Sequence, residues 1–226
     1  MTAWRHGVIV GTVLAALAGA ARAADIEQPP VCYSTAPTDN VISRLQQRLD
    51  AGRATLTFEK SCGYLRSLLR ELRVPESSQV LVFSKTSFQR HRIAPRSPRA
   101  LYFNDDVYVG FCQNGEVLEV SAVDPQLGLV FYTLDQDGDE KPRFTRQTDN
   151  CLICHGSSQN EGLPGHLVRS LYVDGEGLPI LSAGSHRIDH TSPLAERWGG
   201  WYVTGTSGRQ KHMGNLICEG AGRPGW

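Results

Sequence analysis

The sequence has no excess of charge of either sign, only two methionines, and no apolar run that could cross a bilayer after its first 23 residues. Its 23 basic and 23 acidic residues cancel, so it lacks the basic surface that binds nucleic acids or anionic membranes. The 226 residues contain no internal repeat and no low-complexity tract, which excludes solenoids and long disordered segments. We therefore expect a globular protein of one large or two small domains, with no nucleic-acid partner.

The first 23 residues have the three parts of a secretory signal peptide. A short basic start precedes an apolar stretch over 7–18, GVIVGTVLAALA, and small residues follow at Ala21 and Ala23. A membrane anchor is the alternative, but this stretch is shorter than the ~20 apolar residues needed to span hydrocarbon. Cleavage after Ala23 removes two basic residues and no acidic one, which leaves 21 basic and 23 acidic residues. The sequence predicts a periplasmic or otherwise exported protein, with no transmembrane segment after cleavage.

The stretch DNCLICHG, residues 149–156, contains a C-x-x-C-H motif. Cys151 and Cys154, one helical turn apart, can form thioethers with the two vinyl groups of a porphyrin, and His155 can bind the iron as proximal ligand. Haem attachment to thiols takes place outside the cytoplasm, which agrees with the predicted export. The motif occurs once, so we predict one covalent haem c per chain, held by Cys151, Cys154 and His155.

Three other interpretations of the motif are a zinc half-site, a thioredoxin-type redox pair and a plain disulfide. Zinc would need a second Cys/His pair at ligand spacing, and no second C-x-x-C follows. A redox C-x-x-C gains nothing from the histidine that follows it. Haem attachment is therefore the favoured interpretation.

Four cysteines lie outside the motif: Cys32, Cys62, Cys112 and Cys218. An even number of thiols in an oxidising compartment favours disulfide bonds. Cys32 and Cys62 lie on either side of the first expected helix and are the preferred pair. The alternative is that all four are separate buried thiols.

Hydrophobic periodicity divides the chain into helices, then strands, then a glycine-rich tail. Helices are expected over 41–49, capped by Thr38 or Asp39, and over 64–72. Short β-prone runs follow at 80–83, 100–103, 107–111, 117–120 and 129–134, with a hairpin turn at 114–115. In the tail, strands are expected at 167–173 and 200–203. We predict an α+β fold. Residues 24–146 form a region of N-terminal helices and an antiparallel β meander, and residues 147–226 form a loop-rich, cytochrome-c-like haem-binding region.

The sixth ligand of the iron is not fixed by the motif. Met213 is the only methionine of the mature chain, and thioether ligation raises the reduction potential in cytochromes c. We take Met213 as the leading metal ligand beside His155, and a gap-filling core residue as its other interpretation. The alternatives are an open sixth position or one of the histidines His166, His186, His190 and His212.

Several segments resemble a family of exported bacterial proteins that contain a cytochrome-c domain. They are RALYFNDDVYVG (99–110), VSAVDPQLGLVFYTLDQ (120–136), CLICH (151–155), GLPGHLVRS (162–170), HTSPLAERWGGWYVTGT (190–206) and HMGN (212–215). The resemblance implies haem binding and electron transfer by class, without a substrate. Family members continue beyond HMGN, so it also implies that the C-terminal part is incomplete.

Three functions are compatible with these observations. An electron-transfer protein, working with an unknown redox partner protein, needs only a buried haem with two axial ligands. A haem enzyme or gas sensor needs an open distal site, for which His186, Arg187, Asp189 and His190 of SHRIDH would be candidate acid–base groups, unless they form a solvated turn. A haem that serves only as a structural staple is the third. We favour electron transfer over an enzyme and assign no catalytic residue.

Overall fold

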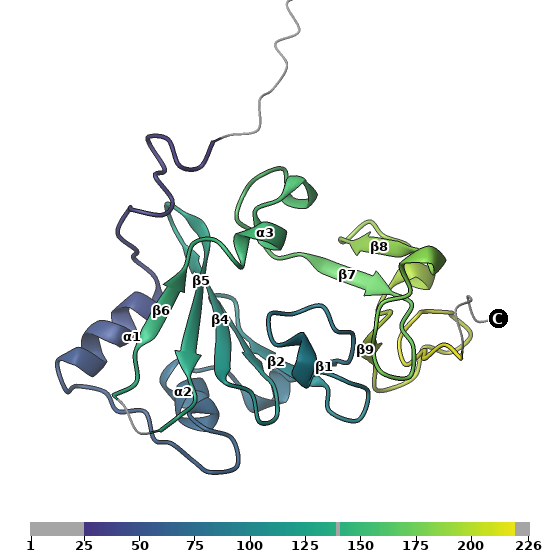
Figure 1. The fold of residues 1–226 in the computed structure, drawn as a ribbon, viewed down its shortest axis with the longest axis horizontal. Coiled ribbons are helices and arrows are strands. Elements are labelled where there is room, and N and C mark those ends of the chain that lie inside the picture. Colours follow the sequence, from purple (N-terminus) through teal and green to yellow (C-terminus); the bar gives the residue numbers. More distant parts are fainter. Residues whose placement is uncertain (1–24, 139–140, 220–226) are drawn as a thin grey trace, which may run out of the picture.

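A computed structural model describes residues 25–138 and 141–219, and Figure 1 shows its fold. The predicted signal peptide lies outside the described residues. Within the described ranges, no helix combines the length and the apolar character that crossing a membrane requires.

A seven-stranded antiparallel sheet forms the centre of the molecule, with strand order β6-β5-β4-β3-β2-β1-β9. The first six strands form a meander in which each pairs with the next along the chain. Asn114, with a positive φ of 56°, makes the tight turn between β3 and β4, as the sequence predicts. The strands are β1 (Val80–Val82), β2 (Arg99–Phe103), β3 (Val107–Phe111), β4 (Val117–Asp124), β5 (Gly128–Asp135), β6 (Phe144–Gln147) and β9 (Trp201–Tyr202).

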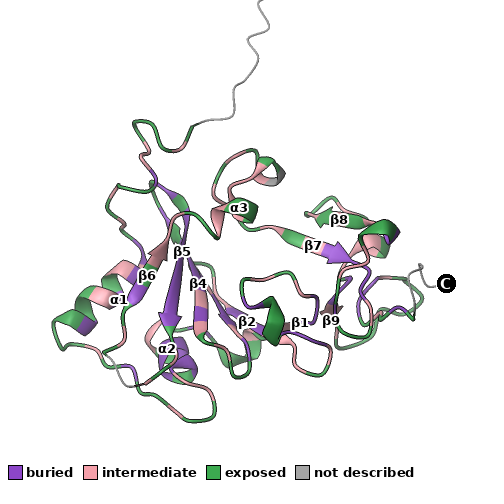
Figure 2. Cartoon of the chain, viewed as in Figure 1, coloured by how far each residue is buried: buried purple, intermediate pink, exposed green. Residues whose placement is uncertain are grey.

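Helices α1 (Val41–Asp50) and α2 (Leu65–Glu71) cover one face of this sheet. Their apolar side chains and alternate residues of β2 to β6 form the main hydrophobic core, which Figure 2 shows as the buried part of these elements. Asn40 begins α1, because its side chain accepts hydrogen bonds from the backbone N–H groups of Ile42 and Ser43. The prediction of Thr38 or Asp39 as the cap was therefore wrong by one or two residues.

The chain after β6 forms a single helical turn and a smaller C-terminal lobe, residues 168–219. Helix α3 (Leu152–His155) contains the end of the C-x-x-C-H motif, and β7 (Val168–Leu171) pairs with β8 (Ser185–Ile188) in a two-stranded sheet. Strand β9 then pairs with β1 and joins the lobe to the main sheet. Five short 3-10 helices are described: Glu76–Ser78, Arg90–Arg92, Ser158–Asn160, Leu181–Ala183 and Leu194–Glu196.

The predicted fold class, α+β with N-terminal helices, a β meander and a cytochrome-like haem region, was wrong. The protein is mostly antiparallel β-sheet with few helices. Helices α1 and α2 have only 10 and 7 residues, and they act as cover for a larger sheet. Strand β9 belongs to the main sheet, and the position 146/147 lies within β6.

The expected disulfide between Cys32 and Cys62 is not formed, and all six cysteines are free. The two residues lie near opposite ends of β5. The hydroxyl of Tyr33 donates to the carbonyl of Leu129 at the start of that strand, whereas the turn that contains Cys62 packs against Gln136, just after its end. Eight residues of β-strand separate these ends, far more than the ~7 Å that a disulfide can bridge between Cα atoms.

Candidate haem site

The C-x-x-C-H motif forms one helical turn that is anchored on the main core. Cys151 has helical backbone angles, and the backbone N–H of His155 donates to its carbonyl at 2.9 Å. Leu152 packs against the main core, while Ile153 points outward and is 71% exposed. Cys151 and Cys154 thus lie one turn apart, the arrangement that two porphyrin thioethers require.

The two thiols of the motif differ in burial and therefore in reactivity. Cys151 is half-buried, and its burial raises the pKa of its thiol to about 11. Cys154 is exposed. Because the thiolate is the reactive form of cysteine, Cys154 is the more accessible nucleophile of the pair.

We expect this difference to be measurable in the haem-free protein. Iodoacetamide at pH 8 should alkylate Cys154 at least about tenfold faster than Cys151, because a buried thiol with a raised pKa forms little thiolate. Peptide mass spectrometry over a time course gives both rates. Cys112, whose burial raises its thiol pKa to about 12, is the control and should react as slowly as Cys151. Equal rates at Cys151 and Cys154 would contradict the described burial.

His155 is fixed in one tautomer by its surroundings. Its Nδ1 lies 2.9 Å from the carbonyl oxygen of Gly165, and a carbonyl only accepts, so Nδ1 carries the proton. The Nε2 lone pair is therefore left for a metal, as in metal sites whose ligating histidine donates its other N–H to a carbonyl. The ring packs on Phe131 with centroids 4.8 Å apart. Burial also lowers the pKa of His155, which keeps the imidazole in its neutral, metal-binding form.

His166 lies on the same face of the sheet as His155. We call this face, which is opposite to α1 and α2, the α3 face. It carries alternate side chains of the central strands: Arg99, Tyr108, Glu119, Ser121 and Phe131. The Nε2 atom of His166 is 2.8 Å from Ser121 Oγ, and its ring centroid is 4.2 Å from that of Tyr108. Burial, and next the neighbouring His155, lower the pKa of His166 to about 4. Both imidazoles are neutral at pH 7.

A shielded ion pair completes the α3 face. Arg99 and Glu119 approach to 2.7 Å, with side chains only 19% and 16% exposed. The guanidinium passes over Gly110 of the strand between them, where a Cβ atom would come within 2.4 Å of an Arg99 nitrogen. Glu119 also accepts hydrogen bonds from Ser87 and Gln89. The buried Nε of Arg99 finds no acceptor in the described part of the chain.

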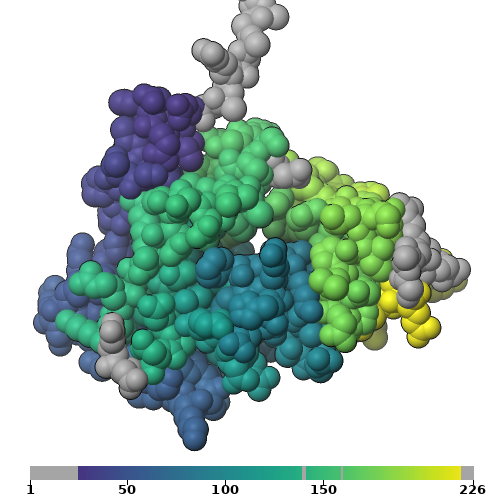
Figure 3. Space-filling model, in the orientation of Figure 1, coloured from purple at the N-terminus to yellow at the C-terminus, as the bar shows by residue number. Residues whose placement is uncertain are grey.

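These features fit a covalent haem. The two thiols have the required spacing, His155 presents Nε2, and the unpaired Nε of Arg99 could meet a propionate. Figure 3 shows an opening in the surface between the green segment that contains the motif and the lime-green C-terminal lobe. Among the described residues, no three His, Cys, Asp or Glu side chains converge as they would at a metal centre made by protein ligands alone.

The other predicted iron ligands lie in the C-terminal lobe. Met213 is 1% exposed in a small core with Tyr172, Ala183 and Cys218, and its sulfur accepts a hydrogen bond from Ser170 at 3.5 Å. Here it fills the core, which was the second interpretation of this residue.

The three remaining histidines of the lobe each have local partners. The ring of His212 packs edge-on against Trp198, and His186 lies 3.4 Å from the carboxylate of Glu196. The carbonyl of His190 accepts a hydrogen bond from Arg197. The structure therefore brings His166 to the neighbourhood of His155, whereas the imidazoles of His186 and His212 contact residues of the C-terminal lobe.

The segment SHRIDH forms the whole of β8 and the start of the turn that follows it. The carboxylate of Asp189 is used by the turn itself, accepting from the backbone N–H groups of Thr191 and Ser192. Asp189 and His190 therefore lie in an exposed turn, whereas His186 and Arg187 belong to β8 and pair with Ser170 and Arg169 of β7.

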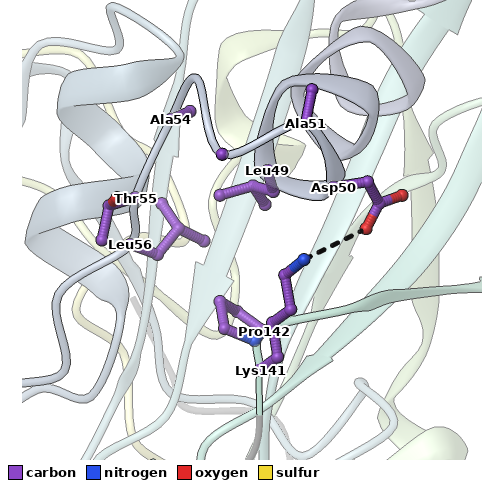
Figure 4. A pocket seen from close by; sticks show the side chains of 9 residues that line it. Leu49, Asp50, Ala51, Ala54, Thr55, Leu56, Lys141 and Pro142 are labelled. Atoms are coloured by element: carbon purple, nitrogen blue, oxygen red, sulfur yellow. Dashed lines mark ion pairs between the residues drawn. The ribbon is translucent and has the colours of Figure 1, made fainter.

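A surface pocket lies on the opposite side of the sheet, between the end of α1 and residues 141–142 (Figure 4). Leu49 and Leu56 form its apolar floor, and Lys141 at its rim lies 4.0 Å from Asp50. Apart from this exposed pair and Thr55, its lining is apolar side chains and glycine, and we assign it no function.

Sequence analysis missed the ion pair of the α3 face. A signal was available, because Arg99 directly precedes one predicted strand and Glu119 lies within another, and both alternate with apolar residues and so point away from the core. Gly110 in the strand between them was a second signal, since glycine within a strand often marks a close approach.

No family model, curated protein or solved structure matches the chain. The resemblance to exported cytochrome-c-domain proteins therefore stays a prediction that rests on the quoted segments.

Proposed function

We propose that this protein is an exported c-type cytochrome that binds one haem covalently and transfers single electrons to a redox partner protein. The observation that carries the proposal is the hydrogen bond from Nδ1 of His155 to the carbonyl of Gly165. It fixes the imidazole directly after the two thiols of the motif and leaves Nε2 available to a metal. The iron of the bound haem supplies the redox chemistry by alternating between its ferric and ferrous states.

The residues of the chain have distinct roles in this proposal. Each thiol of Cys151 and Cys154 adds across a vinyl group, so that an S–C bond forms, the vinyl double bond becomes single and the thiol hydrogen moves to carbon. His155 holds the iron through Nε2. Phe131, whose ring packs against that of His155, and Leu152, which packs against the main core, limit access of water. Arg99 is the cation available to a propionate.

Redox titration of the exported protein tests the electron-transfer role. We expect a reversible transition with the slope of one electron per haem, and a ferrous spectrum that carbon monoxide leaves unchanged because both axial positions are filled. Absence of a reversible transition would contradict electron transfer. Rapid carbon monoxide binding would instead favour the alternative, a haem enzyme or gas sensor with an open distal site.

Export is tested separately by the mass of the mature chain. We expect the protein recovered from the periplasm to begin at Ala24, since Ala21 and Ala23 occupy the small-residue positions before the cleavage site. Intact mass after haem removal gives the N-terminus directly. A membrane-bound chain that retains residues 1–23 would contradict the signal-peptide prediction.

A further inference from the structure

The loop after the motif closes on His155 and fixes the position of the residue that follows it. The backbone N–H of Gly165 donates to the carbonyl of His155 at 2.9 Å, and the imidazole of His155 donates back to the carbonyl of Gly165. The side-chain amide of Asn160 donates to both of these carbonyls, at 3.0 Å to that of His155 and at 2.9 Å to that of Gly165. His166 therefore leaves the loop directly beside His155.

The sheet beneath sets the two imidazoles on neighbouring strands. His155 packs on Phe131 of β5, and His166 bonds to Ser121 of β4. Phe131 and Ser121 are direct partners in the antiparallel ladder, and the Cα atoms of such partners lie about 4.5–5.5 Å apart. His155 and His166, which are 11 residues apart in the chain, thus contact adjacent positions of the same sheet.

We propose that His166 is the second axial ligand of the haem iron, opposite His155. This inference rests on the proposed function, because it requires the haem that the motif would hold. His166 is the histidine that the fold delivers next to His155, while Met213 is packed in the core of the C-terminal lobe. When the ring of His166 turns to the metal it gives up its hydrogen bond to the hydroxyl of Ser121, a modest loss because such a bond makes only a small net contribution to stability.

Ligation by two histidines has a consequence for the electron carrier. Both axial positions are filled by nitrogen, so the ferric haem is low-spin and closed to small ligands. Methionine ligation raises the potential of cytochromes c relative to such a site. We therefore expect a lower reduction potential than a His/Met cytochrome would have.

Spectroscopy of the haem-loaded, exported protein tests this assignment. The wild type should be low-spin in the ferric state without a sulfur-to-iron charge-transfer band. His166→Ala should keep its haem mass, become high-spin, and bind carbon monoxide in the ferrous state, and added imidazole should restore the low-spin spectrum. Met213→Leu and His212→Ala are the matched controls and should keep the low-spin spectrum of the wild type.

Two further variants separate ligation from folding. Ser121→Ala removes the hydrogen bond to His166 but keeps the imidazole, so its ferric spectrum should remain low-spin. His166→Gln keeps a polar partner for Ser121 and should become high-spin like His166→Ala. A low-spin His166→Ala or His166→Gln, or a Met213→Leu variant that loses the low-spin spectrum, would overturn the assignment. So would a high-spin wild type, whereas a wild type without haem mass would overturn the proposed function itself.

Discussion

Replacing Cys151 and Cys154 together with alanine will abolish covalent haem, whereas the exported wild-type chain will carry one haem that survives denaturation. The thioethers are the covalent links in the proposed site, so their loss removes the attachment completely, although His155 remains. Mass spectrometry of the denatured protein measures the haem mass, and the pyridine spectrum measures the number of thioethers. Each single variant should retain one link and lower the yield of haem protein.

The matched control is the double variant Cys32→Ala, Cys62→Ala, which also removes two thiols. Both residues are free in the structure and lie near the far ends of β5 rather than in the motif. This control should keep one covalent haem per chain. Exported wild type without haem mass would refute the haem interpretation, and equal haem content in both double variants would refute attachment at Cys151 and Cys154.

Removing Arg99 will destabilise the fold more than the loss of any exposed charge. Arg99→Ala leaves the carboxylate of Glu119 at 16% exposure without its cation, and breaking a shielded pair in this way costs about 3 kcal/mol. We expect the free energy of unfolding, measured by urea denaturation, to fall by about this amount. The double variant Arg99→Met, Glu119→Leu removes both charges and should recover most of the loss.

Arg92→Ala is the matched control, because Arg92 and Glu116 form a second arginine–glutamate pair at the surface. Their side chains are 40% and 53% exposed, and solvent screening leaves such pairs with little net effect. The midpoint of unfolding should not change measurably. If Arg99→Ala behaved like this control, the ion pair of the α3 face would not be shielded as described.

Local patterns predicted the elements that depend on neighbouring residues. The hairpin around Asn114 was correct because turn chemistry and alternation act over a few residues, and β3 and β4 follow directly from them. Helix α1 was correct for the same reason, since Ile42, Leu45 and Leu49 recur on one face and are buried. Strands β1 to β5 were therefore accessible to sequence reasoning, whereas β6 (Phe144–Gln147) was not predicted.

Contacts between distant segments could not be predicted in this way. The pairing of β9 with β1 joins two segments that lie far apart in the chain, and the periodicity of neither strand predicts it. The neighbourhood of the candidate site depends on which face of the sheet receives α3. His166 stood on the sequence shortlist, but only the closed loop after the motif places it beside His155.

The pairing of β9 with β1 also sets an order of assembly. Trp201 of β9 pairs with Val82 of β1, whereas all other pairings in this sheet join strands that are consecutive in the chain. Local pairings form early and distant ones late, because closing a long loop costs entropy before any contact repays it. If the chain is exported as proposed, the meander and the motif can therefore form before β9 reaches the edge of β1. During that interval the unpaired edge is open to other chains, so slow export or truncation before residue 201 should promote aggregation.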